Sequence, residues 1–264
     1  MTTDSELIPL FSSSRGNSTL IKSGGLNILI DCGKSCKQIT EALLSCGIYP
    51  DDIHAIFLTH GHHDHISGVP VWSRKYHTPI YATSGTLREF KADIPAEINV
   101  IEENDIIDMG GCEVRAFPTA HDIDGSVCYA VINKSTGVKL AVMTDLGKFS
   151  GGLAGFATGA HAILLESNYD VNMLKYGPYS VSLQRRIRGG HGHISNDEAA
   201  QAAEFLITAG TRKFYLGHLS PQNNTPDVAR KTFTDYLATR GFAETRDYEV
   251  RIAAKDGPTE GYGF

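Results

Sequence analysis

The stretch Thr59-His60-Gly61-His62-His63-Asp64-His65 places four histidines and one carboxylate within seven residues. It follows residues 53–58, an apolar run typical of a buried strand. A strand alternates its side chains and the turn after it lets several converge, so four of these residues are expected to face one point: His60, His62, Asp64 and His65. Neutral imidazoles and a carboxylate at this spacing suit zinc, manganese or iron, whereas solvated loop histidines would be the alternative. His63 occupies an intervening position, and we expect it to face away.

Three further candidate ligands each follow an apolar run later in the chain. They are His121 in FPTAHD, Asp145 in VMTDLG and His218 in YLGHLS. Such residues are often plain loop or turn residues, so position after a strand is what favours a ligand role. Asp31 ends the run LNILID, and we expect it to orient a ligand rather than bind metal itself.

With these pieces in this order, the sequence resembles the metallo-β-lactamase fold hydrolases, whose signature T-H-x-H-x-D-H stands here at residues 59–65. The resemblance implies two divalent metal ions, with zinc, manganese and iron all compatible. It implies one metal on His60, His62 and His121, a second on Asp64, His65 and His218, and Asp145 bridging both. Two such cations can share a hydroxide, lower its pKa towards neutrality and bind the oxygen of the attacked group. Asp64 and Asp145 would hold these cations, so we also count both residues as catalytic.

Beyond the shared ligands, the sequence is similar to the WalJ (YycJ) branch of bacterial nucleases over nearly its whole length. The similarity is carried by FSSSRGNST at residues 11–19, LESNYD at 165–170, LQRRIRGGHGHISN at 183–196 and LGHLSPQNN at 216–224. It implies a dinuclear-metal nuclease that acts on DNA from a free 5′ end, linked in bacteria to DNA repair and cell-wall signalling. Nucleases of the β-CASP group carry a large insertion before their last motif, but Asp145 and His218 are only 218 − 145 = 73 positions apart. We therefore expect a single domain over residues 1–264.

A local basic strip gives a separate indication of a phosphodiester substrate. Residues 175–193 contain no acid and four basic residues, namely Lys175, Arg185, Arg186 and Arg188. Such a strip can hold a phosphate backbone, although a solvated helix face with an accidental charge bias is the alternative. Tyr176 and Tyr179 flank the strip and are candidates for stacking a base, with core packing as the alternative.

Other polar residues are placed to reach the same cleft. His193 precedes a helix start, and we expect it to contact phosphate or donate the leaving-group proton, unless it is a loop residue beside the cap. Glu166 and Asn168 follow an apolar strand and are expected to give supporting hydrogen bonds. Residues 12–18 form either a polar loop over the site or a turn between two strands.

The periodicity of the chain predicts two sheets covered by helices. Ser195 and Glu198 form the S-x-x-E pattern that starts a helix. Helices are predicted at residues 35–46, 69–77, 84–91, 196–209 and 226–239, and strands at 7–11, 19–22, 26–31, 53–58, 79–82, 112–117, 127–132, 138–143, 162–165, 213–216 and 248–252. The fold class is therefore α/β, a four-layer αβ/βα sandwich rather than a Rossmann sheet.

Composition limits what this chain of 264 residues can be. Lys and Arg total 24 and Asp and Glu 30, a net charge of −6, with 41% hydrophobic residues, which is typical of a globular protein. An acidic balance argues against phosphate binding over the whole surface. The sequence lacks a membrane-spanning run and a basic, apolar leader, so we expect a cytoplasmic protein. Five scattered cysteines are expected to be buried thiols.

The favoured function is a two-metal phosphodiesterase, a 5′-to-3′ exodeoxyribonuclease that uses a metal-bridging hydroxide. A small-molecule metallohydrolase acting on a thioester, lactone or cyclic nucleotide stays open, because one fold can host many reactions. A non-catalytic metal-binding regulator is the third hypothesis. Oligomeric state is not indicated by the sequence.

Overall fold

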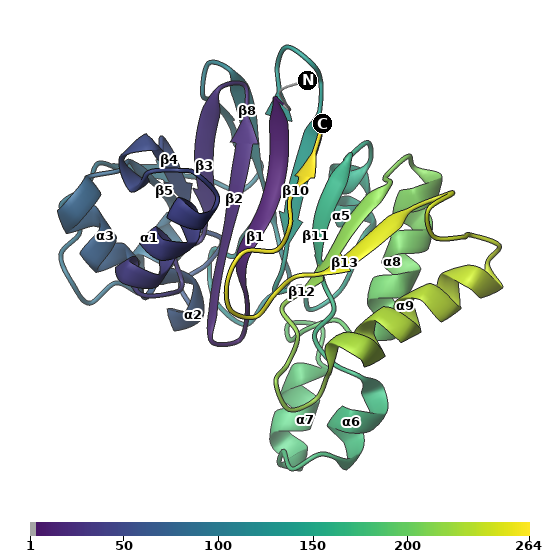
Figure 1. Cartoon of the computed structure of the whole chain (residues 1–264). Coiled ribbons are helices and arrows are strands. Elements are labelled where there is room, and N and C mark those ends of the chain that lie inside the picture. The colour runs from purple at the N-terminus through teal and green to yellow at the C-terminus, as the bar shows by residue number, and fades with distance from the viewer. Residues whose placement is uncertain (1–3) are drawn as a thin grey trace.

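Two seven-stranded sheets face each other at the centre of the computed structural model, which describes residues 4–264 (Figure 1). In spatial order, the first sheet contains β14 (Tyr262–Gly263), β1 (Ser5–Ser13), β2 (Gly16–Ser23), β3 (Leu26–Ile30), β4 (Ala55–Phe57), β5 (Ile80–Thr83) and β6 (Ile98–Ile101). The second contains β13 (Glu249–Ile252), β12 (Lys213–Gly217), β11 (Ala162–Glu166), β10 (Lys139–Met143), β9 (Val127–Asn133), β8 (Cys112–Pro118) and β7 (Ile106–Asp108).

Both sheets follow the same plan, with antiparallel strands at one side and parallel strands at the other. In the first sheet the parallel strands run from β3 to β6, and in the second they run from β10 to β13. Ligand sites in α/β proteins lie beyond the carboxyl ends of such strands, where connecting loops begin. The plan therefore brings loops from both sheets to one edge of the molecule.

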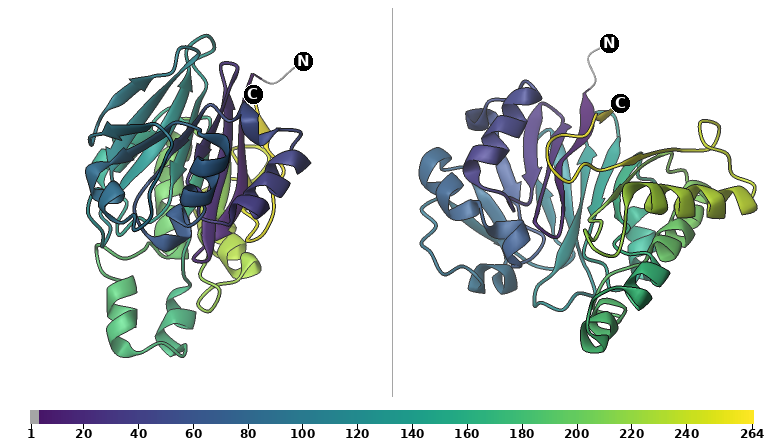
Figure 2. Two further views of the ribbon diagram at one scale, coloured as in Figure 1. Left: turned by 90° about the vertical axis from the view of Figure 1, so that its left-hand side faces the viewer. Right: turned by 60° about the horizontal axis from the view of Figure 1, so that its bottom comes forward.

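Helices cover the outer faces of both sheets (Figure 2). In chain order, the helical segments are α1 (Cys36–Ser45), the 3₁₀ turn η1 (Pro50–Asp52), α2 (His63–Ile66), α3 (Val69–Tyr76), α4 (Ser84–Arg88), α5 (Gly151–Ala157), α6 (Val171–Tyr176), α7 (Val181–Ile187), α8 (Asn196–Thr208) and α9 (Pro226–Thr239). Leu43 of α1 and Trp72 of α3 pack on the first sheet, and Leu206 of α8 and Phe233 of α9 pack on the second.

A separate core fills the space between the sheets. Ile21 and Phe57 of the first sheet pack there with Tyr129 and Val142 of the second. Burying each side chain of this size stabilises the fold by about 1.5–3 kcal/mol. The Tyr129 hydroxyl donates a 2.8 Å hydrogen bond to the carbonyl oxygen of Leu58, which ties the sheets together beside the site. The predicted four-layer α/β sandwich is confirmed.

Several predicted elements are confirmed at their boundaries, and others are wrong. Ser195 and Glu198 make the reciprocal capping box at the start of α8, and α9 spans the predicted residues 226–239. The predicted helix 84–91 ends early, at Arg88, and the predicted strand 7–11 is longer at both ends, Ser5–Ser13. Four of the five cysteines are buried, and Cys46 is half-buried.

Helices α6 and α7, joined by residues 177–180, project from the body of the molecule, and we call residues 171–187 the arm (Figures 1 and 2). Neither helix was predicted from the sequence. Leu174 is the buried residue of α6, and every residue of α7 is at least partly exposed. Among residues 4–264, no helix has the length and apolarity that crossing a membrane requires.

Candidate metal centre

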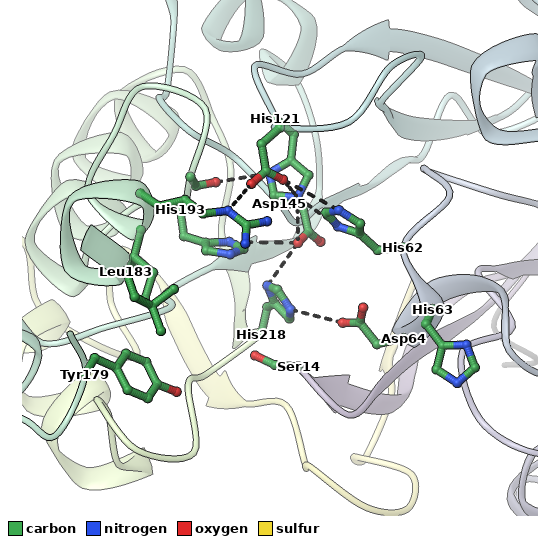
Figure 3. Close-up of a pocket in the computed structure, with 14 residues that line it drawn as sticks. Ser14, His62, His63, Asp64, His121, Asp145, Tyr179, Leu183, His193 and His218 are labelled. Carbon is green, nitrogen blue, oxygen red and sulfur yellow. Dashed lines mark hydrogen bonds and ion pairs between the residues drawn. The ribbon is translucent and has the colours of Figure 1, made fainter. Parts of the chain in front are cut away.

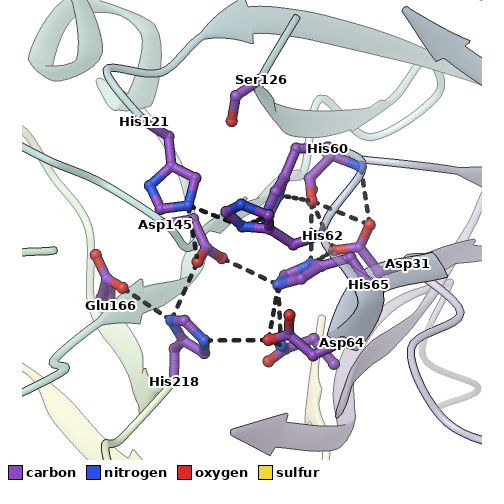
Figure 4. Close-up of polar contacts among 12 residues, drawn as sticks. Asp31, His60, His62, Asp64, His65, His121, Ser126, Asp145, Glu166 and His218 are labelled. Atoms are coloured by element: carbon purple, nitrogen blue, oxygen red, sulfur yellow. Dashed lines mark hydrogen bonds and ion pairs between the residues drawn. The ribbon is translucent and has the colours of Figure 1, made fainter. Parts of the chain in front are cut away.

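Residues from both sheets meet at the shared edge to form one polar cluster (Figure 4). From the first sheet, Asp31 follows β3 and the histidine-rich stretch 59–65 follows β4. From the second, His121 follows β8, Asp145 follows β10, and His218 follows β12. Each of these polar segments begins one to three residues after the end of its strand, so the apolar strand fixes where its side chains lie.

Three of these residues have left-handed backbone conformations. The φ angle is 65° at Asp31, 58° at Asp145 and 54° at His218. Aspartate and histidine enter this region more readily than most side chains, but it still costs of the order of 1–3 kcal/mol at each position. The left-handed conformation thus occurs after the strand ends, at the residues whose side chains point into the cluster.

His60, His62 and His121 form the first group of possible ligands. Nδ1 of His62 lies 3.0 Å from Nε2 of His60 and 3.2 Å from Nε2 of His121. Burial lowers the pKa of His60 well below its ordinary value, and it also lowers the pKa of His62. Both imidazoles are therefore kept neutral, which is the form that binds a metal.

Asp64, His65 and His218 form the second group. Oδ2 of Asp64 lies 3.6 Å from Nε2 of His65 and 3.7 Å from Nε2 of His218. Burial alone would raise the pKa of Asp64, but the two histidines outweigh it and lower that pKa. The carboxylate stays ionised at neutral pH.

Asp145 lies between the two groups. Its Oδ2 is 3.2 Å from Nε2 of His65, and its Oδ1 is 3.7 Å from Nε2 of His121. Burial would raise its pKa, but the facing imidazoles, above all His218 and His65, hold the pKa well below its ordinary range. One buried carboxylate therefore reaches both groups.

Two buried atoms in the cluster make no well-aligned hydrogen bond within residues 4–264, namely Oδ2 of Asp145, although Nε2 of His65 is 3.2 Å away, and Nε2 of His218. Buried polar atoms without partners are uncommon because desolvation is costly, and an unfilled ion site is one explanation. Imidazole nitrogens and carboxylate oxygens suit borderline divalent cations. The residues present thus fit divalent metal ions.

The buried carboxylate of Asp31 contacts the His65 ring on the side away from the cluster. Oδ2 of Asp31 lies 2.7 Å from Nδ1 of His65, while Oδ1 accepts hydrogen bonds from the backbone N–H and the hydroxyl of Thr59. This contact fixes the ring and leaves Nε2 of His65 facing the cluster.

Glu166 does the same for two histidines on the other side. Its Oε1 lies 2.8 Å from Nδ1 of His193 and 2.9 Å from Nδ1 of His218, and its Oε2 accepts from the backbone N–H of Leu146. It is fully buried. Asn168 supports the same loop, because its side chain donates to the carbonyl oxygen of His218 at 2.8 Å.

His193 is half-buried and lines a cavity of about 350 Å³ above the cluster (Figure 3). With Nδ1 held by Glu166, its Nε2 is left for a ligand. Burial alone would lower the pKa of His193, but the Glu166 carboxylate outweighs it and raises the pKa. The ring is therefore suited to carry a proton that it can give up.

The four residues of the predicted basic strip occupy different places. Arg186 lines the cavity, whereas Lys175, Arg185 and Arg188 are exposed outside its lining. Tyr176 is 76% exposed and lies beside its neighbouring lysine, so core packing is wrong for this residue.

Tyr179, whose role the sequence left open, and His63, which was expected to face away, both lie at the cavity. Tyr179 lines it, and His63 lies exposed at its rim, turned away from the other histidines (Figure 3).

One residue that touches the cluster, Asp122, was not predicted from the sequence. Oδ1 of Asp122 lies 3.6 Å from Nε2 of His62, and its Oδ2 lies 2.6 Å from Nε of Arg186. Its position directly after His121 was the available signal. Asn17, in the 12–18 segment, donates a 3.2 Å hydrogen bond to Oδ2 of Asp64. Residues 12–18 span the end of β1, the tight turn at 14–15 and the start of β2, and they also reach the site.

Comparisons with known proteins agree with the geometry. The family described as beta-lactamase superfamily domain matches residues 26–219. Exodeoxyribonuclease YycJ of Bacillus anthracis is 36% identical over 256 residues, which cover 95% of this chain and 96% of that protein. Exodeoxyribonuclease WalJ of Streptococcus pneumoniae serotype 2 (strain D39 / NCTC 7466) is 33% identical over 257 residues, 95% of this chain and 94% of that one.

A solved structure shows the same fold. The metallo-beta-lactamase fold protein YhfI from Bacillus subtilis has a TM-score of 0.69 with this chain, covering 98% of this chain and 99% of the other at 19% identity. At that identity, the likeness speaks for the fold alone.

Proposed function

The chain belongs to the beta-lactamase superfamily as a metal-dependent hydrolase, and from that premise we propose that it is a two-metal phosphodiesterase that removes nucleotides from the 5′ end of DNA. One observation carries the proposal: two groups of ligand-type residues, joined by one buried carboxylate, meet at the base of a cavity that also holds an arginine and a histidine. The names of the relatives YycJ and WalJ support DNA as the substrate.

We assign one metal to His60, His62 and His121 and the second to Asp64, His65 and His218, with Asp145 serving both. Bound divalent cations supply an activated water at neutral pH and neutralise charge on the attacked phosphoryl group. The ionised state of Asp64 and Asp145 prepares the site for cations, because both carboxylates are already charged in the folded chain. Zinc, manganese and iron all suit this ligand set.

The remaining residues of the cavity act on the substrate itself. Arg186 faces the cavity and is placed to bind a non-bridging phosphate oxygen. Glu166 raises the pKa of His193 and so favours its protonated form, and we assign His193 the transfer of its proton to the departing 3′-oxygen as the P–O bond breaks. The exposed Lys175, Arg185 and Arg188 are placed to contact the DNA backbone beyond the cavity.

Digestion of 5′-labelled and 3′-labelled DNA, single- and double-stranded, by manganese-loaded protein tests this function. We expect labelled mononucleotide to leave the 5′ end first, and we expect His62→Ala and Asp64→Ala to abolish digestion. His63→Ala is a matched control from the same motif, since His63 lies at the rim facing away, and it should retain activity.

The small-molecule alternative gives the opposite outcome in the same experiment. If DNA survives with several metals while a thioester, a lactone or a cyclic nucleotide is cleaved, the nuclease assignment is wrong and the ligand set serves another substrate. Replacing Arg185, Arg186 and Arg188 together separates the two further, because a nuclease depends on phosphate contacts much more than a small-ester hydrolase does.

A further inference from the structure

The cavity above the metal cluster has two chemically different walls. One is polar and belongs to the cluster, with His62, Asp64 and His218 among its residues. The other belongs to the arm and is formed by Tyr179, Leu183 and Ile187, all half-buried. Figure 3 shows Tyr179 and Leu183 projecting from the arm on the side of the cavity opposite His62. A ligand that fills this cavity must therefore be charged on one side and apolar on the other.

The apolar wall is a regular feature of α7. Leu183 and Ile187 are four residues apart and so share one helix face, and Tyr179 lies one turn earlier in the chain. The side chain of Gln184 donates a 2.9 Å hydrogen bond to the carbonyl oxygen of Tyr179, and Ser180 caps the helix, so the segment before α7 is held in place. An apolar stripe that faces a polar site, and not a core, is suited to an apolar ligand group.

Arg186 supplies a positive charge at the edge of the same wall. Its Nε bonds to Asp122, while Nη1 and Nη2 have no protein partner among residues 4–264. The free guanidinium edge can thus bind an anion beside the apolar stripe. A flat apolar ring joined to a phosphate matches this pairing, which is the structure of a nucleotide.

The volume of about 350 Å³ limits the ligand to a small one, since ligand cavities in proteins range from about 300 to 1,000 Å³. Resting on the proposed function, we infer that the cavity binds the terminal nucleotide of a DNA strand with its base unpaired against Tyr179 and Leu183. The partner base of a duplex would have to be displaced first. The substrate is therefore a DNA end whose terminal base is unpaired once it lies in the cavity, whether that strand begins as a single strand or in a duplex.

The test compares two single-stranded oligonucleotides, one with a 5′-terminal thymidine nucleotide and one with an abasic tetrahydrofuran nucleotide at the same position. Stacking of a base on an aromatic side chain contributes enough to change affinity by roughly 5- to 100-fold. We expect kcat/KM of the manganese-loaded protein to fall by that factor for the abasic end. The double variant Tyr179→Ala/Leu183→Ala should cleave both ends at the abasic rate, and Tyr179→Phe should retain the preference.

Tyr176→Ala is the matched control, because this tyrosine is on the same arm but is 76% exposed and outside the cavity lining. It should preserve the preference for a base. The inference is overturned if the wild-type protein cleaves both ends equally, or if the double variant keeps the preference.

Failure of the proposed function gives a different pattern. In that case the folded, metal-loaded wild-type protein cleaves none of the DNA ends, and the inference falls with the function. If DNA is cleaved but the terminal base has no effect, the nuclease function stands and the role of the arm wall is wrong.

Discussion

The carboxylate of Asp122 joins Arg186 of the arm to the histidines of the first metal group. Its Oδ2 lies 2.6 Å from Nε of Arg186, and its Oδ1 lies 3.5 Å from Nε2 of His121. The arginine is therefore oriented by a group that itself contacts the cluster. Because the arm has little core of its own, this ion pair is a defined link between it and the site.

Replacing either partner of this pair should weaken DNA binding in the same way. We expect Asp122→Ala and Arg186→Ala each to raise KM for single-stranded DNA about tenfold, the scale of one charge-assisted phosphate contact. The double variant should be little worse than either single variant, because both changes remove one interaction. Steady-state kinetics of the four proteins measure the coupling. Additive effects would contradict it, and Asp124→Ala, which breaks an exposed pair with Arg88, is the control.

Asp31→Asn should weaken metal binding without removing a ligand. The carboxylate holds Nδ1 of His65 at 2.7 Å, and the loss of such an orienting contact typically lowers metal affinity by about 10- to 100-fold. Titration of the metal-free protein with manganese, followed by electron paramagnetic resonance, measures this affinity. Asp51→Asn changes an exposed aspartate and should bind manganese normally. Normal affinity in Asp31→Asn would show that His65 needs no orienting partner.

Glu166→Gln should move the alkaline limb of the pH–rate profile to lower pH. Glu166 raises the pKa of His193, whereas burial alone would lower it. When the charge is lost, His193 gives up its proton at a lower pH, so a step that needs this proton slows earlier as pH rises. The pH dependence of kcat for both proteins tests this. An unchanged alkaline limb, with a uniform drop in rate, would assign Glu166 a purely structural role.

Metal removal should make stability depend on pH through His218. Burial alone would lower the pKa of His218, but Asp145, Asp64 and Glu166 outweigh it and raise the pKa to about 10, from 6.5. Since the folded value is above the ordinary one, the protonated ring stabilises the metal-free chain fully below pH 6.5, and this contribution is lost as pH rises through 10.

A cation must displace that proton, so the increase in Tm on adding manganese should grow between pH 6.5 and 10. Calorimetry of chelator-treated and manganese-loaded protein measures the difference. His218→Asn should flatten the dependence, and an increment independent of pH in the wild-type protein would contradict it.

Much of the site is predictable because its residues lie close together in the sequence or soon after an apolar strand. The 59–65 stretch needs only one strand and one turn to bring its side chains together, and His121, Asp145 and His218 each follow an apolar strand that is visible in the sequence. The capping box at Ser195 is equally local, since both partners lie within one helical turn.

What sequence reasoning missed depends on contacts between distant segments. Asp122 and Arg186 are 64 positions apart, and Asn17 and Asp64 are 47 apart, so neither pairing has a local pattern. The arm was missed for another reason. Helices α6 and α7 have six and seven residues, too short for a clear hydrophobic period.

The left-handed backbone at Asp31, Asp145 and His218 decides how inactive forms of this protein should be engineered. Alanine at these positions removes the side chain and also places a residue poorly suited to that conformation, so a dead variant could be dead because its loop has moved. Asparagine tolerates the conformation well and nearly preserves the shape of aspartate. Asn variants therefore show the effect of losing the charged carboxylate while the loop keeps its conformation. For crystallography with bound DNA, Asp145→Asn is the inactive variant to make first.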